Sequence, residues 1–161
     1  MGRMNSPAID ARENRFVFSA FVMRQVSAFG GFGILILLAI CVVALSTWDV
    51  ADPSLSHATS REPNNLLGYN GAIFADLMMQ FFGLAGLIAL LPLVAWAFTL
   101  IAGKKINRIP LRLATWVGGA FLASASLGCF APPATWPLPN GIGGVIGDMI
   151  LRFPALFLGE Y

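Results

Sequence analysis

The chain has 161 residues, of which 57% are hydrophobic and only 11% are charged, and its formal net charge is +2. A soluble domain carries about a quarter charged residues, so the composition excludes an ordinary soluble fold. The small net charge also argues against nucleic-acid binding by this chain. These properties together indicate an integral membrane protein.

Three long apolar runs without any charged residue cover residues 29–48, 77–102 and 113–139. A helix needs about twenty predominantly apolar residues to cross the hydrocarbon core of a bilayer. The runs lack the strict alternation of barrel strands, and only helices and closed barrels satisfy every backbone polar group in lipid. We therefore predict an all-α integral membrane protein, a four-helix transmembrane bundle. Its spans are expected at about 29–48, 77–102 and 112–131, with a fourth that starts at about residue 142.

The distribution of charge predicts the orientation. Residues 1–28 contain four arginines and two acids, whereas the connection after the second apolar run has four basic residues and no acid: Lys104, Lys105, Arg108 and Arg112. Basic residues of short loops stay on the cytoplasmic side. We therefore expect a cytoplasmic N-terminal tail at 1–28 and a membrane anchor domain at 29–161. Its inner loop is 103–111 and its outer loops are 49–70 and 132–141.

Prolines and turn-forming residues punctuate these segments. Asp52-Pro53 and Glu62-Pro63 lie in the first outer loop, and Pro132-Pro133 begins the second. Prolines end helices where the chain leaves lipid. Inside the second apolar run, Pro92 is expected to bend the helix.

A short internal repeat relates the two halves of the chain. Residues 71–81, GAIFADLMMQF, align without gaps on residues 143–153, GGVIGDMILRF. The alignment favours two helical hairpins of the same orientation, with chance similarity as the alternative. It also bears on the chain end, because Asp148, Arg152 and Pro154 make residues 142–158 a poor span. We expect an interfacial outer helix that leads into a fourth span, truncated at the chain end, so that the sequence is an N-terminal fragment of a longer protein.

Three charged residues lie in or beside the apolar runs: Asp76, Asp148 and Arg152. Asp76 and Asp148 each follow an outer-loop glycine by five residues, so we expect all three at interface depth, with each carboxylate near the start of a helix. On a helix, Asp148 and Arg152 can pair. The alternative is a proton or ion relay, as in a small transporter.

Stripes of small residues mark surfaces for close helix packing. Thr115, Gly119 and Ala123 recur at intervals of four, and Gly143 and Gly147 form a G-x-x-x-G. Such stripes let helix backbones approach each other. Packing within one bundle and packing between subunits both remain open from the sequence. Nucleotide-binding and metal-ligand motifs are absent, so no cofactor, catalytic residue or metal site is expected in this chain.

The segment after the first apolar run resembles the FtsK/SpoIIIE-type DNA translocases. The resemblance lies in the turn Asp52-Pro53-Ser54-x-Ser56, in residues 65–76, which read N-x-x-G-x-x-G-A-x-x-A-D, and in Phe82-Gly83 followed by Pro92. The glycine-rich segment 141–148 is similar to the start of the family's fourth span. Together these matches cover roughly residues 29 to 161.

The resemblance implies an N-terminal, multi-pass anchor in the bacterial inner membrane, placed at the division septum. In that family the anchor targets and assembles a hexameric ATP-driven motor that moves chromosomal DNA during segregation. ATP, Mg²⁺ and DNA would be bound only by the motor, which this sequence lacks. The implied partners of the anchor are the lipid bilayer, further copies of the chain and other cell-division proteins. The rival interpretation from another class is a small multi-span transporter or ion-conducting subunit.

Overall fold

The computed structural model describes residues 7–55 and 57–158, and this part of the chain is helical with no strand. Its helices are α1 (Pro7–Ser46), α2 (Gly68–Phe82), α3 (Ala85–Ile101), α4 (Ile109–Gly128) and α5 (Gly144–Leu158). The prediction of an all-α fold is therefore confirmed for the described residues.

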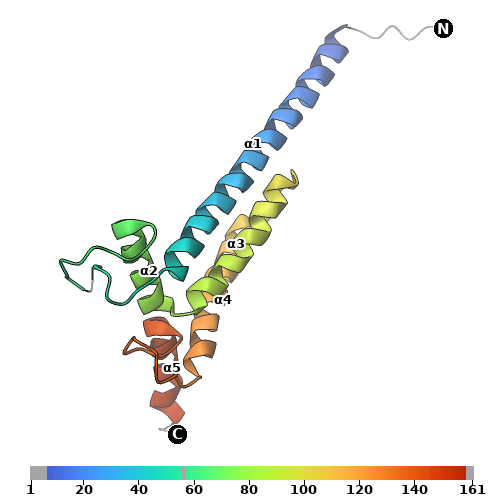
Figure 1. Ribbon diagram of the computed structural model, residues 1–161. Coiled ribbons are helices and arrows are strands. Elements are labelled where there is room, and N and C mark those ends of the chain that lie inside the picture. Colours follow the sequence, from blue (N-terminus) through green and yellow to red (C-terminus); the bar gives the residue numbers. More distant parts are fainter. Residues whose placement is uncertain (1–6, 56, 159–161) are drawn as a thin grey trace.

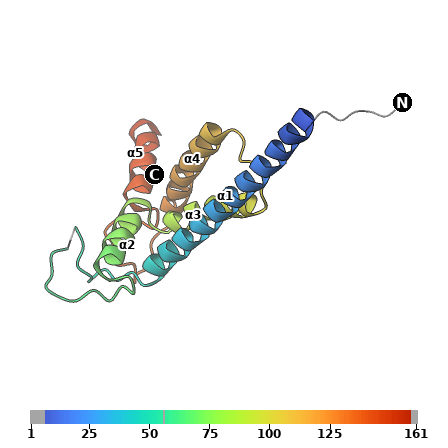
Figure 2. The same cartoon turned by 90° about the horizontal axis from the view of Figure 1, so that it is seen from above.

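The helices form an elongated array with two different ends (Figure 1). Helix α1 packs along α3, and α3 packs against α4. The short helices α2 and α5 gather at one end, together with loops 47–67 and 129–143, and we call this the outer end (Figure 1). The opposite end carries loop 102–108 and is called the inner end. Figure 2 shows that α1 continues beyond α3 there, as its 40 residues, about 60 Å, lead us to expect.

Close backbone packing joins α1 to α3. A methyl group placed on Gly31 would lie 2.6 Å from the Ala97 carbonyl oxygen, so glycine is required at that crossing. The Ser27 hydroxyl donates a 2.8 Å hydrogen bond to the Leu100 carbonyl oxygen. Of the residues assigned to the tail, 7–28 thus belong to helix α1. The helix begins at Pro7, and its part suited to a bilayer is Phe21–Ser46 rather than 29–48.

Residues 77–102, the expected second span, do not form one continuous helix, because the chain breaks at residues 83–84. Helix α2 already begins at Gly68, inside the predicted outer loop, and its axis meets that of α3 at 106°. Gly83 has φ 57°, a left-handed conformation that glycine adopts without steric cost. Pro92, where a bend was expected, lies inside the unbroken helix α3.

Aromatic side chains fasten α3 to α4. The rings of Trp96 and Trp116 meet edge to face with centroids 6.2 Å apart. The Trp116 indole N–H also donates a 2.7 Å hydrogen bond to the Ala89 carbonyl oxygen. Nearer the outer end, Phe82 stacks on Phe121 at 6.3 Å. These contacts fix α4 beside α3 although neither helix buries many side chains.

Many large apolar side chains of the helices are exposed. The buried hydrophobic cluster lies at the outer end and consists of Ala44, Leu45, Ala75 and Met79. Along α1, by contrast, large apolar side chains such as Phe29, Phe32 and Ile36 are exposed. Among the described helices, Phe21–Ser46 is long and apolar enough to cross a membrane, and the bent pair α2–α3 qualifies only when taken as one span.

Candidate functional surfaces

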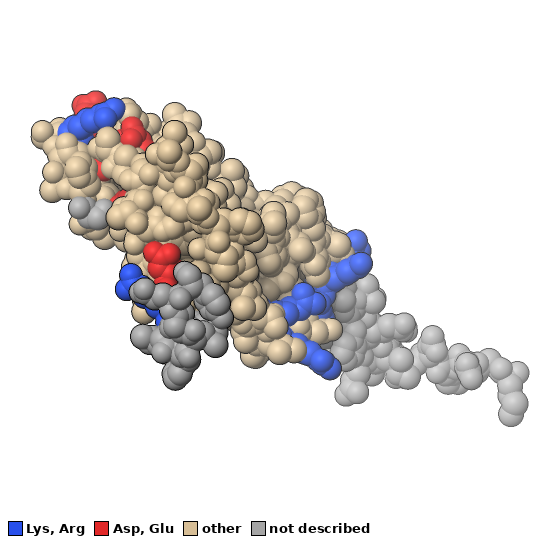
Figure 3. Space-filling view, turned by 90° about the horizontal axis from the view of Figure 1, so that it is seen from below, with Lys and Arg blue, Asp and Glu red and all other residues tan. Residues whose placement is uncertain are grey.

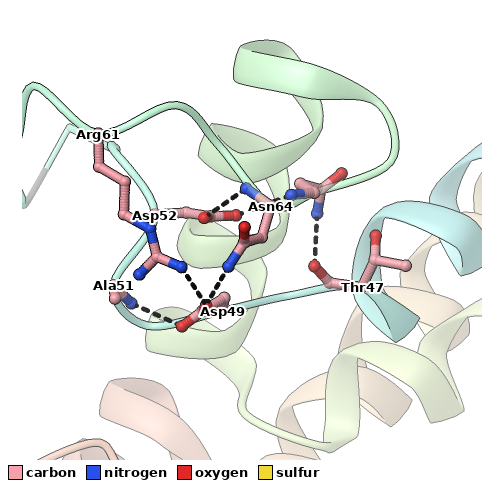
Figure 4. A network of polar contacts seen from close by, with 7 residues as sticks. Thr47, Asp49, Ala51, Asp52, Arg61 and Asn64 are labelled. Carbon is pink, nitrogen blue, oxygen red and sulfur yellow. Dashed lines mark hydrogen bonds and ion pairs between the residues drawn. The ribbon is translucent and has the colours of Figure 1, made fainter.

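The first outer loop is a folded element built on a buried carboxylate. Asp52 is only 2% exposed, and its two oxygens accept backbone N–H groups of Asn64 at 2.7 Å and Asn65 at 3.0 Å. Figure 4 shows how these bonds draw the two ends of the loop together. Because a buried carboxylate needs such donors, Asp52 fixes the loop conformation.

Asn65 connects the end of α1 to the start of α2. Its side-chain amide donates to the carbonyl oxygens of Ala44 at 2.8 Å and Thr47 at 3.2 Å. Its side-chain oxygen accepts the N–H of Leu67 at 3.1 Å. A methyl group on Gly71 would collide with that oxygen, so the glycine is needed for this contact. One side chain therefore satisfies backbone groups at two helix ends.

Asp49 organises the exposed side of the same loop. Its carboxylate accepts the Ala51 N–H and the Asn64 side-chain amide, both at 2.9 Å, and the Arg61 guanidinium lies 4.0 Å away. The Ala51 and Asn64 hydrogen bonds, with a smaller contribution from Arg61, hold the pKa of Asp49 below its ordinary value. The carboxylate is thus kept charged by donors within the loop.

The second outer loop is packed onto the first half of the molecule. The Trp136 indole N–H donates to the Asn140 carbonyl oxygen at 2.9 Å, and its backbone N–H donates to Pro133 at 2.8 Å. Trp136 and Leu138 pack against the buried cluster that includes Ala44. The loop therefore covers the junction of α1 and α2.

Two glycines lock the α2–α3 break to the start of α5. The Leu84 N–H donates to the Ile142 carbonyl oxygen at 3.0 Å. A methyl group on Gly83 would collide with the same carbonyl, and one on Gly144 would lie 2.7 Å from the Gly83 nitrogen. Gly144 also has a positive φ of 67°. The two halves related by the internal repeat thus meet backbone to backbone.

The small-residue stripes have two different environments. A methyl group on Gly147 would lie 2.5 Å from the Ser124 carbonyl oxygen, and one on Gly143 would collide with it, so α5 packs closely on α4. Gly119 differs, because a methyl group there meets no atom within 4 Å, and Thr115 is exposed. Ala123 is half-buried. The stripe formed by Thr115, Gly119 and Ala123 therefore leaves its central position open.

The three charged residues near the apolar runs also lie in different environments. Asp76 lies in the middle of α2, is 6% exposed and accepts the Gln80 side-chain amide at 2.9 Å, so its expected place near a helix start is wrong. Asp148 is half-buried in the second turn of α5, and Arg152 is exposed one turn later. In the described chain the two form no ion pair within 4.0 Å. The Asp76 carboxylate is therefore bonded within α2 and largely shielded from solvent.

The basic residues gather at the inner end. Lys104, Lys105 and Arg108 lie in loop 102–108 and Arg112 in the first turn of α4, and all four are exposed. Figure 3 shows their blue surface far from the red of the outer loop. Sequence reasoning gave no structural role to Arg24, whose side chain lies against Gly103. The feature of the sequence that could have indicated this role is the position of Arg24 just before the first apolar run.

This arrangement, an apolar helical array with basic residues at one end and a folded polar loop at the other, is that of a membrane-anchoring region. The chain matches the family described as the 4TM region of DNA translocase FtsK/SpoIIIE over residues 23–161. The chain therefore belongs to this family, and the resemblance seen in its motifs is confirmed.

Individual relatives extend the match to the whole chain. It is 65% identical to the DNA translocase FtsK of Agrobacterium fabrum and 58% identical to that of Rhizobium meliloti, in each case over 161 residues, all of this chain and 18% of the relative. It is 38% identical to the DNA translocase FtsK of Caulobacter vibrioides over 125 residues, 74% of this chain and 15% of the relative. The chain thus spans less than a fifth of these relatives, and no solved structure matches it.

Proposed function

We propose that this chain is the multi-pass inner-membrane anchor of a DNA translocase and that it gathers copies of the translocase at the division septum. The observation that carries the proposal is the family match over residues 23–161, together with relatives whose printed name is DNA translocase FtsK. In this role the chain carries no chemistry of its own. ATP hydrolysis, Mg²⁺ and DNA contacts belong to a motor region beyond the matched part.

The topology that suits this role has four spans, with the inner end in the cytoplasm. Its support is the separation of charge, with Lys104, Lys105 and Arg108 at one end and the Asp49–Arg61 network at the other. In this scheme α1, the bent pair α2–α3 and α4 provide the first three spans. Helix α5 corresponds to α2 in the internal repeat and would lead into the fourth.

Assembly would use the surface that the chain leaves open. A ring motor requires its anchors to surround one axis, and Gly119 offers a place where a second backbone can approach. Contacts with other division proteins would use the outer loop, where Leu55 and Leu66 are each 75% exposed on a rigid, hydrogen-bonded frame. We infer that these two leucines, exposed in an otherwise polar loop, are the docking contacts.

A localisation experiment tests the proposal. The chain, fused to a fluorescent protein, is expected to concentrate at the septum of dividing cells. The double variant Leu55→Ser/Leu66→Ser is expected to stay in the membrane but to lose septal enrichment, because its frame is intact and its apolar contacts are gone. The matched variant Ala58→Ser/Glu62→Gln changes two exposed residues of the same loop and should behave like the wild type. Uniform membrane fluorescence of the wild type would contradict septal targeting.

No observation favours the rival function of an ion-conducting subunit. The pocket of about 340 Å³ to which α1, α2, α3 and α4 contribute is lined by apolar side chains such as Phe74, Leu90 and Val117. Asp76 does not line this pocket, and its carboxylate is bonded to Gln80 on its own helix.

A further inference from the structure

A cleft at the inner end brings three cations together from separate parts of the chain. It lies between α1 and loop 102–108, has a volume of about 780 Å³, and is lined by Arg24, Lys104 and Lys105 among others. Arg24 belongs to α1, whereas the lysines follow α3. The three positive charges therefore share one cleft only in the folded chain.

The fold holds these cations in place. Helix α3 ends with the Gly103 N–H donating to the Leu100 carbonyl at 2.9 Å and the Lys104 N–H donating to the Thr99 carbonyl at 3.1 Å. This is the Schellman arrangement, and Gly103 adopts its left-handed conformation with φ 68°. The stem of Arg24 lies against Gly103, where a methyl group would be 2.9 Å from its Cγ. The backbone that carries the two lysines and the stem of Arg24 are thus fixed relative to each other, while the three charged residues remain exposed to a ligand.

In the described part of the chain, no acidic residue lines the cleft. The ion pair found there, Arg61 with Asp49, is at the outer end, and Asp76 and Asp148 lie on the outer helices α2 and α5. Among the residues drawn in colour, Figure 3 shows the blue of the inner end apart from the red. Like charges held in one cleft repel each other, and an anion bound between them would relieve that repulsion.

The rest of the lining is partly apolar and partly polar, the polar residues being Ser19, Ser27 and Asn107. Met23 and Ile109 line the cleft and are exposed, and Leu100 and Ile106 also contribute to its wall. A ligand that suits this lining has an anionic group for the cations and a hydrocarbon part for the apolar wall. Such a ligand is available where the inner end meets the cytoplasmic leaflet, whose anionic lipids attract basic segments.

We propose that this cleft binds one anionic phospholipid of the cytoplasmic leaflet. The lipid phosphate lies between Arg24, Lys104 and Lys105, and an acyl chain follows Met23 and Ile109 out of the cleft. The site would fix the depth and rotation of α1 relative to α3 in the bilayer. The proposal rests on the cleft and on the cytoplasmic position proposed for the inner end, but not on septal targeting, so septal targeting can fail without it.

Native mass spectrometry of the full chain in mild detergent tests the site, with phosphatidylglycerol and phosphatidylcholine as probes. The wild type is expected to retain phosphatidylglycerol in preference to phosphatidylcholine. Lys104→Gln/Lys105→Gln should weaken phosphatidylglycerol binding at least about tenfold, and Arg24→Gln about fivefold, since each basic residue contributes roughly a factor of five. The matched control is Arg108→Gln/Arg112→Gln, which removes the same charge from exposed positions that do not line the cleft.

The control should keep its affinity to within about twofold if the site is specific. Equal losses in the two double variants would mean that loop charge alone attracts the lipid, and the site would be rejected. Equal retention of phosphatidylcholine by the wild type would also reject it. Displacement of the lipid by millimolar inorganic phosphate would show that the cleft recognises a phosphate ion and not a lipid. Circular dichroism of each variant verifies that the helices are intact.

Discussion

The side-chain amide of Asn65 donates a 2.8 Å hydrogen bond to the carbonyl oxygen of Ala44, 21 residues earlier in the chain. This bond joins the last turn of α1 to the residues just before α2. It lies in the buried cluster at the outer end, so it is shielded from water. The outer loop consequently holds the ends of α1 and α2 together through the Asn65 side chain. The Asp52 carboxylate fixes the loop at a second place.

Replacing Asn65 by alanine is expected to lower the free energy of unfolding by about 2 kcal/mol, because buried carbonyls and an N–H lose their partner. The thermal midpoint in detergent measures the effect. Asn64→Ala is the control, since it removes only the exposed side-chain bond to Asp49 and keeps the bond from the Asn64 backbone N–H to Asp52. Equal decreases in the thermal midpoint of the two variants would show that the Asn65 side chain does not stabilise the chain more than its exposed neighbour does.

Gly83→Ala is expected to destabilise the chain by more than about 1 kcal/mol, because its φ is positive and the added methyl group meets the Ile142 carbonyl. Gly86→Ala, three residues later, should be neutral or stabilising by up to about 1 kcal/mol, since its methyl group would have ordinary contacts in a helix. Chemical or thermal unfolding of the two variants compares them directly. A stable Gly83→Ala protein would argue for an unbroken helix through residues 77–102.

Because α4 and α5 pack closely, Gly147→Ala is expected to lower the free energy of unfolding by about 1–3 kcal/mol, since the added methyl group forces the Ser124 backbone away. Thermal unfolding in detergent measures the effect.

Gly119→Leu should leave the free energy of unfolding unchanged and should instead reduce self-association. The oligomer mass in detergent or nanodiscs reports the second effect. Gly118→Leu, which also meets no atom within 4 Å, is the matched control on the neighbouring face. An unchanged mass for Gly119→Leu would mean that this stripe faces lipid.

The lowered pKa of Asp49 predicts how stability depends on pH. A carboxyl group whose pKa is lower in the folded chain stabilises that chain above its ordinary pKa of 3.8, and the contribution is lost as the pH falls through the lowered value. Asp49→Asn should therefore have a lower thermal midpoint than the wild type at pH 7, with the difference closing below pH 3.8. A difference that stays constant down to pH 2 would contradict the assignment.

Thiol labelling tests the orientation. In a background in which Cys41 and Cys129 are serine, cysteines at Leu55 and Thr135 are expected to react with an impermeant reagent added to intact spheroplasts. A cysteine at Asn107 should react only after the membrane is opened, because its loop carries the basic residues. Ser56, the other suitable position in the first outer loop, lies outside the described residues. Labelling of Asn107 from outside would reverse the topology.

The sequence determined the class of the protein, because three uncharged apolar runs and segregated basic residues leave few alternatives to a helical membrane anchor. The turn motifs around Asp52 and residues 65–76 also identified the family. In both cases the signal is local, since it depends on which residues follow one another along the chain.

Only the tertiary structure decided where the second apolar run breaks and which small residues are covered. The uncharged run continues on both sides of Gly83, so the 106° bend becomes visible only when the Ile142 carbonyl occupies the space beside it. The stripes of Gly119 and Gly147 are equivalent in spacing, yet only one has a partner helix. Likewise, Arg24 joins Lys104 and Lys105 because α1 and α3 cross closely, a contact between residues far apart in the sequence.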